Sequence, residues 1–135
     1  GVLVTPGIHV STPDAYRALN REAIAVAEEA VPRATRELVW SMDESRAAGG
    51  NLWQAQLRND FEQPVFKSHP EVAKIHRALE KTSALAVRMS GSGSTVFSLY
   101  RNASEARAAA SSLAWPCQVF RSVSRSEYLR QFRGA

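Results

Sequence analysis

The stretch RMSGSGSTVF, residues 88–97, contains the residues best suited to chemistry in this chain. Gly91 and Gly93 can adopt positive φ angles and allow another group to approach closely, and successive backbone N–H groups in such a loop can converge on an anion. The neighbouring hydroxyl groups add donors. The residues of this glycine loop are Ser90, Gly91, Ser92, Gly93, Ser94 and Thr95.

Phosphate is the ligand that such a loop suits best. The loop is neither a GxGxxG stretch opening a helix nor a P-loop, because no lysine follows its second glycine. A simple hairpin needs only two turn residues, so the loop is longer than a turn requires. From the residues alone, a flexible hairpin connection remains an equal alternative to a phosphate site.

Several elements must position this loop. Residues 2–5 are apolar and β-branched, which predicts a strand close to the first residue. Ser11 or Thr12, followed by Pro13 and Asp14, is typical of a helix start, with a hydroxyl as the cap. We expect helices over residues 21–47, broken or kinked at Pro32, and from residue 52 through residues 58–66.

In the second half of the chain, the spacing of hydrophobic residues changes from that of a helix to that of strands. Residues 70–81 predict a helix with Val72, Ile75 and Leu79 on its buried face. Strands are expected over residues 84–89, 95–100 and 117–123, separated by a helix that Ser104 caps and followed by a short helix over residues 127–132. This order predicts an α+β, ferredoxin-like fold: a four-stranded antiparallel sheet with helices packed on one face and extra helices in the first crossover.

Composition limits the classes of protein. The chain has 135 residues, 44% of them hydrophobic and 22% charged, which fits one globular domain over residues 1–135. The net charge of +4 is spread over helical stretches apart from the basic C-terminal tail, so we expect no nucleic-acid partner. Membrane-spanning runs and signal-peptide patterns are missing from the sequence, and no membrane partner is expected. The single cysteine, Cys117, predicts a buried structural thiol, no metal site and a cytoplasmic setting.

Four segments together resemble a known family. RNDFEQPVF, PEVAKIHRAL and AVRMSGSGSTVFSLY, with the opening VLVTPGIHVSTPDAY, are similar to the C-terminal domain of the GHMP kinase superfamily. The resemblance covers both ends of the chain in the right order and is weakest over residues 21–50. The most similar branch phosphorylates a cytidine diphosphate conjugate of methylerythritol in the non-mevalonate isoprenoid pathway.

The resemblance implies an activity and roles for particular residues. Members of the superfamily phosphorylate a hydroxyl of a small molecule with ATP and Mg²⁺. The glycine loop, Ser90 to Thr95, is similar to the motif that shapes the region around the phosphates. Ser11, Thr12 and Pro13 match a segment that borders the substrate pocket.

Asn59, Asp60, Phe61 and Glu62 match the family's NDFE signature. Asp60 and Glu62 could form an acid/base pair, but we favour a structural role, in which the carboxylates cap backbone groups or pair with arginine. Arg88 is either such a partner or a residue that faces the phosphates.

The sequence also departs from the family. The superfamily's ATP loop, and the first-domain segment that carries its catalytic Lys and Asp, are not in these residues. We therefore expect no catalytic residue and no tightly bound cofactor in this chain. It would form one wall of an active site that a missing N-terminal kinase domain completes, and would be inactive alone. Without that domain we expect self-association through an uncovered face that includes Trp40, Trp53, Phe61 and Phe66.

Two other classes fit parts of the sequence. A free-standing ferredoxin-like module that binds a small molecule or protein without catalysis is the main alternative. An RNA-binding sheet would need exposed aromatic residues on one face of the middle strands, but Phe97 and Tyr100 have opposite parity.

Overall fold

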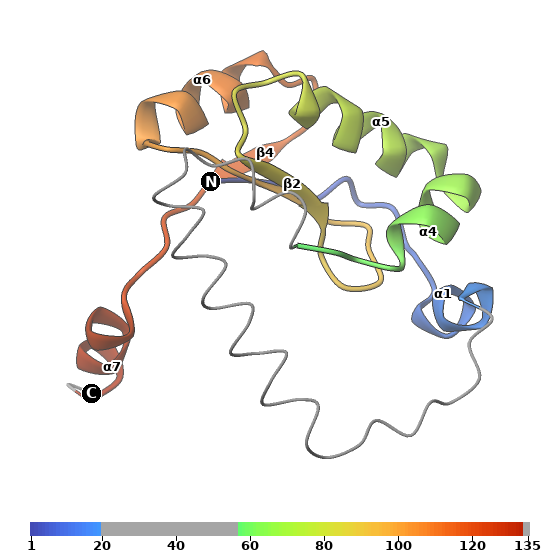
Figure 1. Ribbon diagram of the computed structural model, residues 1–135, viewed down its shortest axis with the longest axis horizontal. Coiled ribbons are helices and arrows are strands. Elements are labelled where there is room, and N and C mark those ends of the chain that lie inside the picture. Colours follow the sequence, from blue (N-terminus) through green and yellow to red (C-terminus); the bar gives the residue numbers. More distant parts are fainter. Residues whose placement is uncertain (20–56, 134–135) are drawn as a thin grey trace.

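The computed structural model describes residues 1–19 and 57–133, and these form an α+β fold (Figure 1). In chain order the elements are β1 (Val2–Val4), α1 (Thr12–Ala18), α4 (Glu62–Ser68), α5 (Pro70–Glu80), β2 (Ala86–Met89), β3 (Val96–Leu99), α6 (Ala103–Ser112), β4 (Cys117–Val119) and α7 (Arg125–Arg133). The helices predicted over residues 21–47 and 52–56 lie outside the described residues.

The four strands form one antiparallel sheet in the order β2-β3-β1-β4. Val4 of the central strand pairs with Val96 of β3 on one side and with Cys117 of β4 on the other. This order, with α1, α4 and α5 between β1 and β2, confirms the predicted ferredoxin-like arrangement.

Helices α5 and α6 cover one face of the sheet (Figure 1). The strands alternate accordingly: Val2 and Val4 of β1 are fully buried beneath the helices, whereas Leu3 between them is partly exposed. Most buried hydrophobic residues of the described part of the chain form one core cluster, which contains Val2, Val4, Val10, Ala15, Val65, Val72, Ile75, Leu79, Val87, Met89, Val96, Ala106 and Ala109.

Helix α5 shows why the sequence folds this way. Pro70 occupies its first turn, and Val72, Ile75 and Leu79 are completely buried, as their spacing predicts. Near its start, Glu71 accepts a hydrogen bond of 3.1 Å from the indole Nε1 of Trp115. This bond and the nearby Lys74 ammonium hold the pKa of Glu71 below its ordinary value.

Three predicted details were wrong. The cap of α6 is Asn102, whose side chain accepts from the N–H of Glu105, and Ser104 lies within the helix. Residues 57–61 form a turn rather than part of a helix, and β4 ends at Val119. The first error has a physical reason: Asn and Ser are equally good caps, so local preference does not choose between neighbouring candidates.

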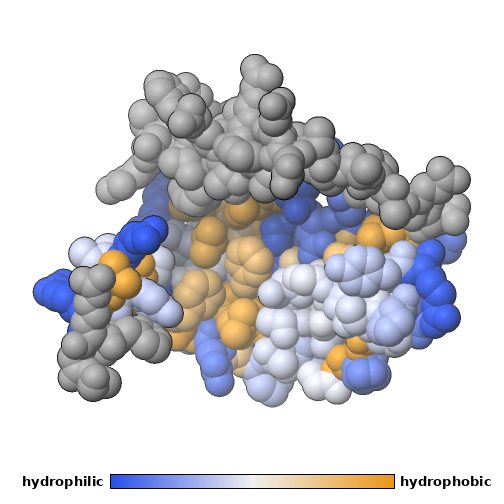
Figure 2. All heavy atoms as spheres, turned by 90° about the horizontal axis from the view of Figure 1, so that it is seen from below, coloured by the Kyte–Doolittle hydropathy of each residue, from blue (hydrophilic) through white to orange (hydrophobic). Residues whose placement is uncertain are grey.

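Hydrophobic residues also gather on the side opposite α5 and α6, in the middle of the view in Figure 2. Phe61 and Phe66 are partly buried against the core, in agreement with the expectation of partial exposure. Trp40 and Trp53 lie outside the described residues, and self-association stays a prediction. Among the residues that the structure describes, the exposed large hydrophobic side chains are Tyr16, Val119, Phe120, Val123 and Tyr128.

In the described ranges, 1–19 and 57–133, no helix combines the length and apolar character needed to cross a membrane.

We predict that Asn102→Ala destabilises the fold by about 1 kcal/mol, because the first turn of α6 loses its cap. Ser104→Ala is the matched control, since this exposed serine lies inside the helix. Urea denaturation of each variant measures the free energy of unfolding. A larger loss for Ser104→Ala than for Asn102→Ala would contradict the assignment of the cap.

Candidate phosphate and substrate site

The glycine loop joins the two neighbouring strands β2 and β3 and is closed by its own hydrogen bonds. The N–H of Ser90 donates to the carbonyl of Thr95 at 2.8 Å, and the N–H of Gly93 donates to the carbonyl of Ser90 at 3.0 Å. Gly91 and Gly93 have φ angles of 57° and 95°, so both glycines use the backbone freedom that the sequence suggested.

The internal bonds reduce the set of N–H groups that can meet an anion. Those of Ser90 and Gly93 are already paired within the loop. Those of Gly91 and Ser92 donate to no acceptor among the described residues. An anion at this loop would therefore be held by a few backbone donors together with hydroxyl groups, rather than by the whole run of amides.

Gly93 is also where the loop rests on the core. A side chain at this position would place its Cβ only 2.8 Å from the sulfur of Met89, and 3.6 Å from methyl groups of Val10 and Val65. At Gly91, by contrast, a Cβ would meet nothing within 4 Å. Of the two loop glycines, Gly93 alone thus combines a positive φ with close packing.

The fold brings the two predicted site segments together. Thr12 Oγ1 lies 2.9 Å from Ser92 Oγ, although the residues are 80 positions apart. The hydroxyl of Ser94 donates to the carbonyl of Ile8 at 2.5 Å, which ties the loop to the chain that leads into α1. Ser11 caps α1 by accepting from the N–H of Asp14 at 3.4 Å, with Pro13 in the first turn.

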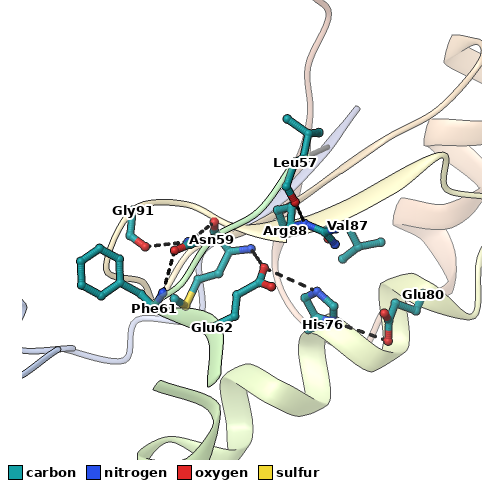
Figure 3. A network of polar contacts seen from close by, with 10 residues as sticks. Leu57, Asn59, Phe61, Glu62, His76, Glu80, Val87, Arg88 and Gly91 are labelled. Atoms are coloured by element: carbon teal, nitrogen blue, oxygen red, sulfur yellow. Dashed lines mark hydrogen bonds and ion pairs between the residues drawn. The ribbon is translucent and has the colours of Figure 1, made fainter. Parts of the chain in front are cut away.

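The turn before α4 holds the other side of the loop. Asn59 Nδ2 donates to the carbonyls of Met89 at 2.7 Å and Gly91 at 2.8 Å, and its Oδ1 accepts from the N–H of Phe61 (Figure 3). Glu62 accepts from the N–H of Met89 at 2.7 Å. The sequence singled out Asn59 only as part of a signature, because its partners lie 30 and 32 residues away.

The charged residues around this turn have mainly structural contacts. Asp60 pairs with Arg58 at 3.6 Å, and Glu62 accepts from a backbone N–H. These are the contacts expected of a structural role, and that role stays a prediction. The guanidinium of Arg88 donates to the carbonyls of Leu57 and Val87.

Sequence reasoning did not identify His76 as part of this site. His76 lies between Glu62 and Glu80 in Figure 3. Its position on the buried side of α5 was the one feature of the sequence that could have pointed to it.

A groove of about 850 Å³ runs between α1 and α4 beside the loop. Val10 and Val65, the neighbours of Gly93, line it, and so do Ser11, Asp14 and Lys67. The Ser11 hydroxyl and the Arg17 guanidinium hold the pKa of Asp14 below its ordinary value, so this carboxylate is ionised at neutral pH. The groove therefore combines an apolar floor with hydroxyl and charged groups.

An exposed aromatic residue stands at the end of the same helix. Tyr16 is 62% exposed, and its ring meets Phe61 edge-to-face at 4.8 Å. Thr12 and Tyr16 are one turn apart on α1, so both lie on the side of the helix that faces the loop and the turn.

Within the part of the chain that the structure describes, no three His, Cys, Asp or Glu side chains are grouped as a metal site. Cys117 is partly buried, and its sulfur lies 3.5 Å from the carbonyl oxygen of Ala110, as a structural thiol would.

The chain belongs to the GHMP kinase C-terminal family, whose model matches residues 17–117. The glycine-rich loop at the end of an edge strand, set against the start of a helix, is therefore a feature of a domain of this family. Several sequence relatives carry one enzyme name. The chain is 40% identical over 102 residues to the 4-diphosphocytidyl-2-C-methyl-D-erythritol kinase of Solibacter usitatus, covering 76% of this chain and 31% of that protein.

The same enzyme name recurs in other relatives. The Rhizobium meliloti protein is 33% identical over 133 residues, which covers 93% of this chain and 40% of that protein. A crystal structure of 4-(cytidine 5'-diphospho)-2C-methyl-D-erythritol kinase superposes with a TM-score of 0.65 at 30% identity, covering 87% of this chain and 40% of that chain. This chain thus spans only 31–40% of the length of these proteins.

We predict that Gly93→Ala destabilises the protein by about 2 to 4 kcal/mol, because a Cβ at a positive φ also meets the Met89 sulfur. Gly91→Ala is the matched control and should cost about 1 to 2 kcal/mol, for its φ angle alone. Thermal and urea unfolding measure both. Equal losses at the two positions would show that the packing beneath Gly93 contributes nothing.

Proposed function

We propose that this chain is the C-terminal domain, residues 1–135, of an ATP-dependent kinase that phosphorylates a hydroxyl of 4-diphosphocytidyl-2-C-methyl-D-erythritol in non-mevalonate isoprenoid biosynthesis. The observation that carries the proposal is the 2.9 Å contact between Thr12 and Ser92, because it joins the glycine loop to the start of α1. Ser11 and Asp14 of the same segment line the groove. The names of the relatives and of the solved structure support the substrate class.

Each part of the site has a proposed role. The glycine loop, Ser90 to Thr95, faces the phosphates with the N–H groups of Gly91 and Ser92 and with its hydroxyls. Ser11, Thr12 and Pro13 border the substrate pocket at the start of α1. Neutral donors suit phosphate because they hold its oxygens without needing their own counterions.

Tyr16 provides a surface for the nucleoside part of such a substrate. Its ring is mostly exposed and is oriented by Phe61, and Thr12 lies one turn before it on α1. Bases stack well on exposed aromatic rings. We therefore propose that the cytosine ring stacks on Tyr16 while the diphosphate extends toward Thr12 and the glycine loop.

The remaining components would come from the N-terminal kinase domain of the longer protein. Phosphoryl transfer depends on positioning and on charge stabilisation by Mg²⁺ and cationic groups. The described residues offer no metal-ligand cluster, so ATP and Mg²⁺ would be held mainly by that domain, and this chain would supply phosphate and substrate contacts only. The reaction would take place in the cytoplasm.

We expect ATP-dependent phosphorylation of the cytidine diphosphate substrate by the gene product extended upstream through a glycine-rich ATP loop. The 135-residue chain alone should be inactive, because it lacks the catalytic groups. A coupled ADP-release assay with both proteins at equal concentration tests this. If the extended protein is folded but inactive, a non-catalytic binding module becomes the better account.

In the active extended protein, Tyr16→Ala should raise the KM for the cytidine diphosphate substrate about 5- to 100-fold, which corresponds to the loss of one stacked base. Tyr16→Phe should keep a near-normal KM. Tyr128→Ala is the matched control, because Tyr128 is also exposed but lies on α7, far from α1 in Figure 1. An unchanged KM in Tyr16→Ala would remove Tyr16 from the substrate site.

A further inference from the structure

Met89, the last residue of β2, is held at three points just before the glycine loop begins. Its carbonyl accepts from Asn59, its N–H donates to Glu62, and its sulfur lies directly beneath Gly93. Because β2 is at the edge of the sheet, an outward N–H on this strand has no strand partner. The carboxylate of Glu62 takes that place at 2.7 Å.

Both the nitrogen and the oxygen of the Asn59 side-chain amide form hydrogen bonds that fix the turn and the loop. Both donor bonds of Nδ2 reach backbone carbonyls at the start of the loop, and Oδ1 accepts from the N–H of Phe61 at 3.0 Å. An aspartate has nearly the same shape but no donor, so it would face two carbonyl oxygens with a negative charge. The required hydrogen-bond pattern therefore specifies asparagine.

His76 lies behind Glu62. The imidazole side chain is only 10% exposed; its Nε2 is 3.7 Å from a carboxylate oxygen of Glu62, and its Nδ1 is 3.5 Å from one of Glu80. The ring also packs against Phe66, with centroids 5.0 Å apart. Nε2 is buried without a hydrogen-bond partner among the described residues. Such a group is costly to bury, so its placement against Glu62 needs a reason.

We propose that Asn59, Glu62 and His76 form a loop clamp whose task is to fix the backbone at the start of the glycine loop. Asn59 and Glu62 hold Met89 and Gly91 directly, and His76 orients the Glu62 carboxylate from the other side (Figure 3). The inference rests on the proposed function, since it assigns these side chains to positioning the groups that would meet the phosphates.

Acid/base chemistry explains this cluster less well. One oxygen of Glu62 is committed to the N–H of Met89, and the Glu62 and His76 side chains are only 18% and 10% exposed. Groups so enclosed are poorly placed to exchange a proton with a substrate hydroxyl. The three residues are therefore positioning residues, acting through the loop.

The test uses the full-length kinase and the isosteric change Asn59→Asp. We expect kcat/KM for ATP to fall about 100-fold, the effect of a displacement of about 1 Å in a positioned group. The matched control is Asn102→Asp, at the opposite end of β3 from the glycine loop. Aspartate keeps the acceptor for the N–H of Glu105 and loses only the bond that Asn102 Nδ2 donates to the Glu105 carboxylate. It should leave kcat and KM unchanged.

Further substitutions test the contributions of His76 and Glu62 to the clamp separately. His76→Leu should lower kcat about 10-fold, and His76→Gln should recover part of the loss by returning an amide donor toward Glu62. Combining Glu62→Gln with His76→Leu should lower kcat no further than the worse single variant, since both act on one contact. Activities are compared per folded molecule at saturating substrate.

Hydrogen exchange gives a readout that does not depend on activity. In Asn59→Asp, the amides of Ser90 and Gly93, which are hydrogen-bonded within the loop, should exchange at least about 10-fold faster than in the wild type, while α5 and α6 keep their protection. If the wild type proves inactive, the proposed function fails, but exchange still tests the clamp. Wild-type exchange at the loop, or wild-type kinetics in folded Asn59→Asp, would overturn the inference. The inference would also be overturned if the loss of activity were merely proportional to the fraction of unfolded protein.

Discussion

The pairing of the short central strand β1 with two strands from the far end of the sequence is the constraint on which this structure depends. Val4 is bonded between Val96 and Cys117, so the chain leaving β1 must run past the end of β3. Thr5 therefore meets Thr95, and a few residues later Ser94 reaches Ile8 and Ser92 reaches Thr12. One strand register thus places the helix start beside the glycine loop.

The loop is held from two directions. On one side stands α1 with its hydroxyl groups, and on the other the turn at Asn59, which binds backbone rather than side chains. Contacts to backbone atoms fix a conformation whatever the loop's own side chains are. That arrangement suits a loop of small residues, because the conformational entropy that such a loop would otherwise lose on binding a ligand is already lost in the folded chain.

The described site has few free charges, and this is consistent with a domain that forms one wall of a larger active site. Asp14 and Arg17 pair with each other, as do Asp60 and Arg58, and Glu62 faces His76. Backbone donors, hydroxyls and an exposed ring remain for ligands. The family match and the limited share of each relative that this chain covers fit the same division of labour between two domains.

The sequence by itself determined most element types and the fold class, and it singled out the two segments of the proposed site. Each depends on local preference: alternating β-branched residues, the buried spacing of Val72, Ile75 and Leu79, and glycines where φ is positive. It did not choose Asn102 over Ser104, since both can cap a helix. Only the tertiary structure decided that the hydroxyls of Thr12 and Ser92 are in contact, that Asn59 donates to the carbonyl of Met89, and that His76 lies beside Glu62. These contacts join residues from 14 to 80 positions apart, and no local preference encodes the strand register and helix packing that bring them together.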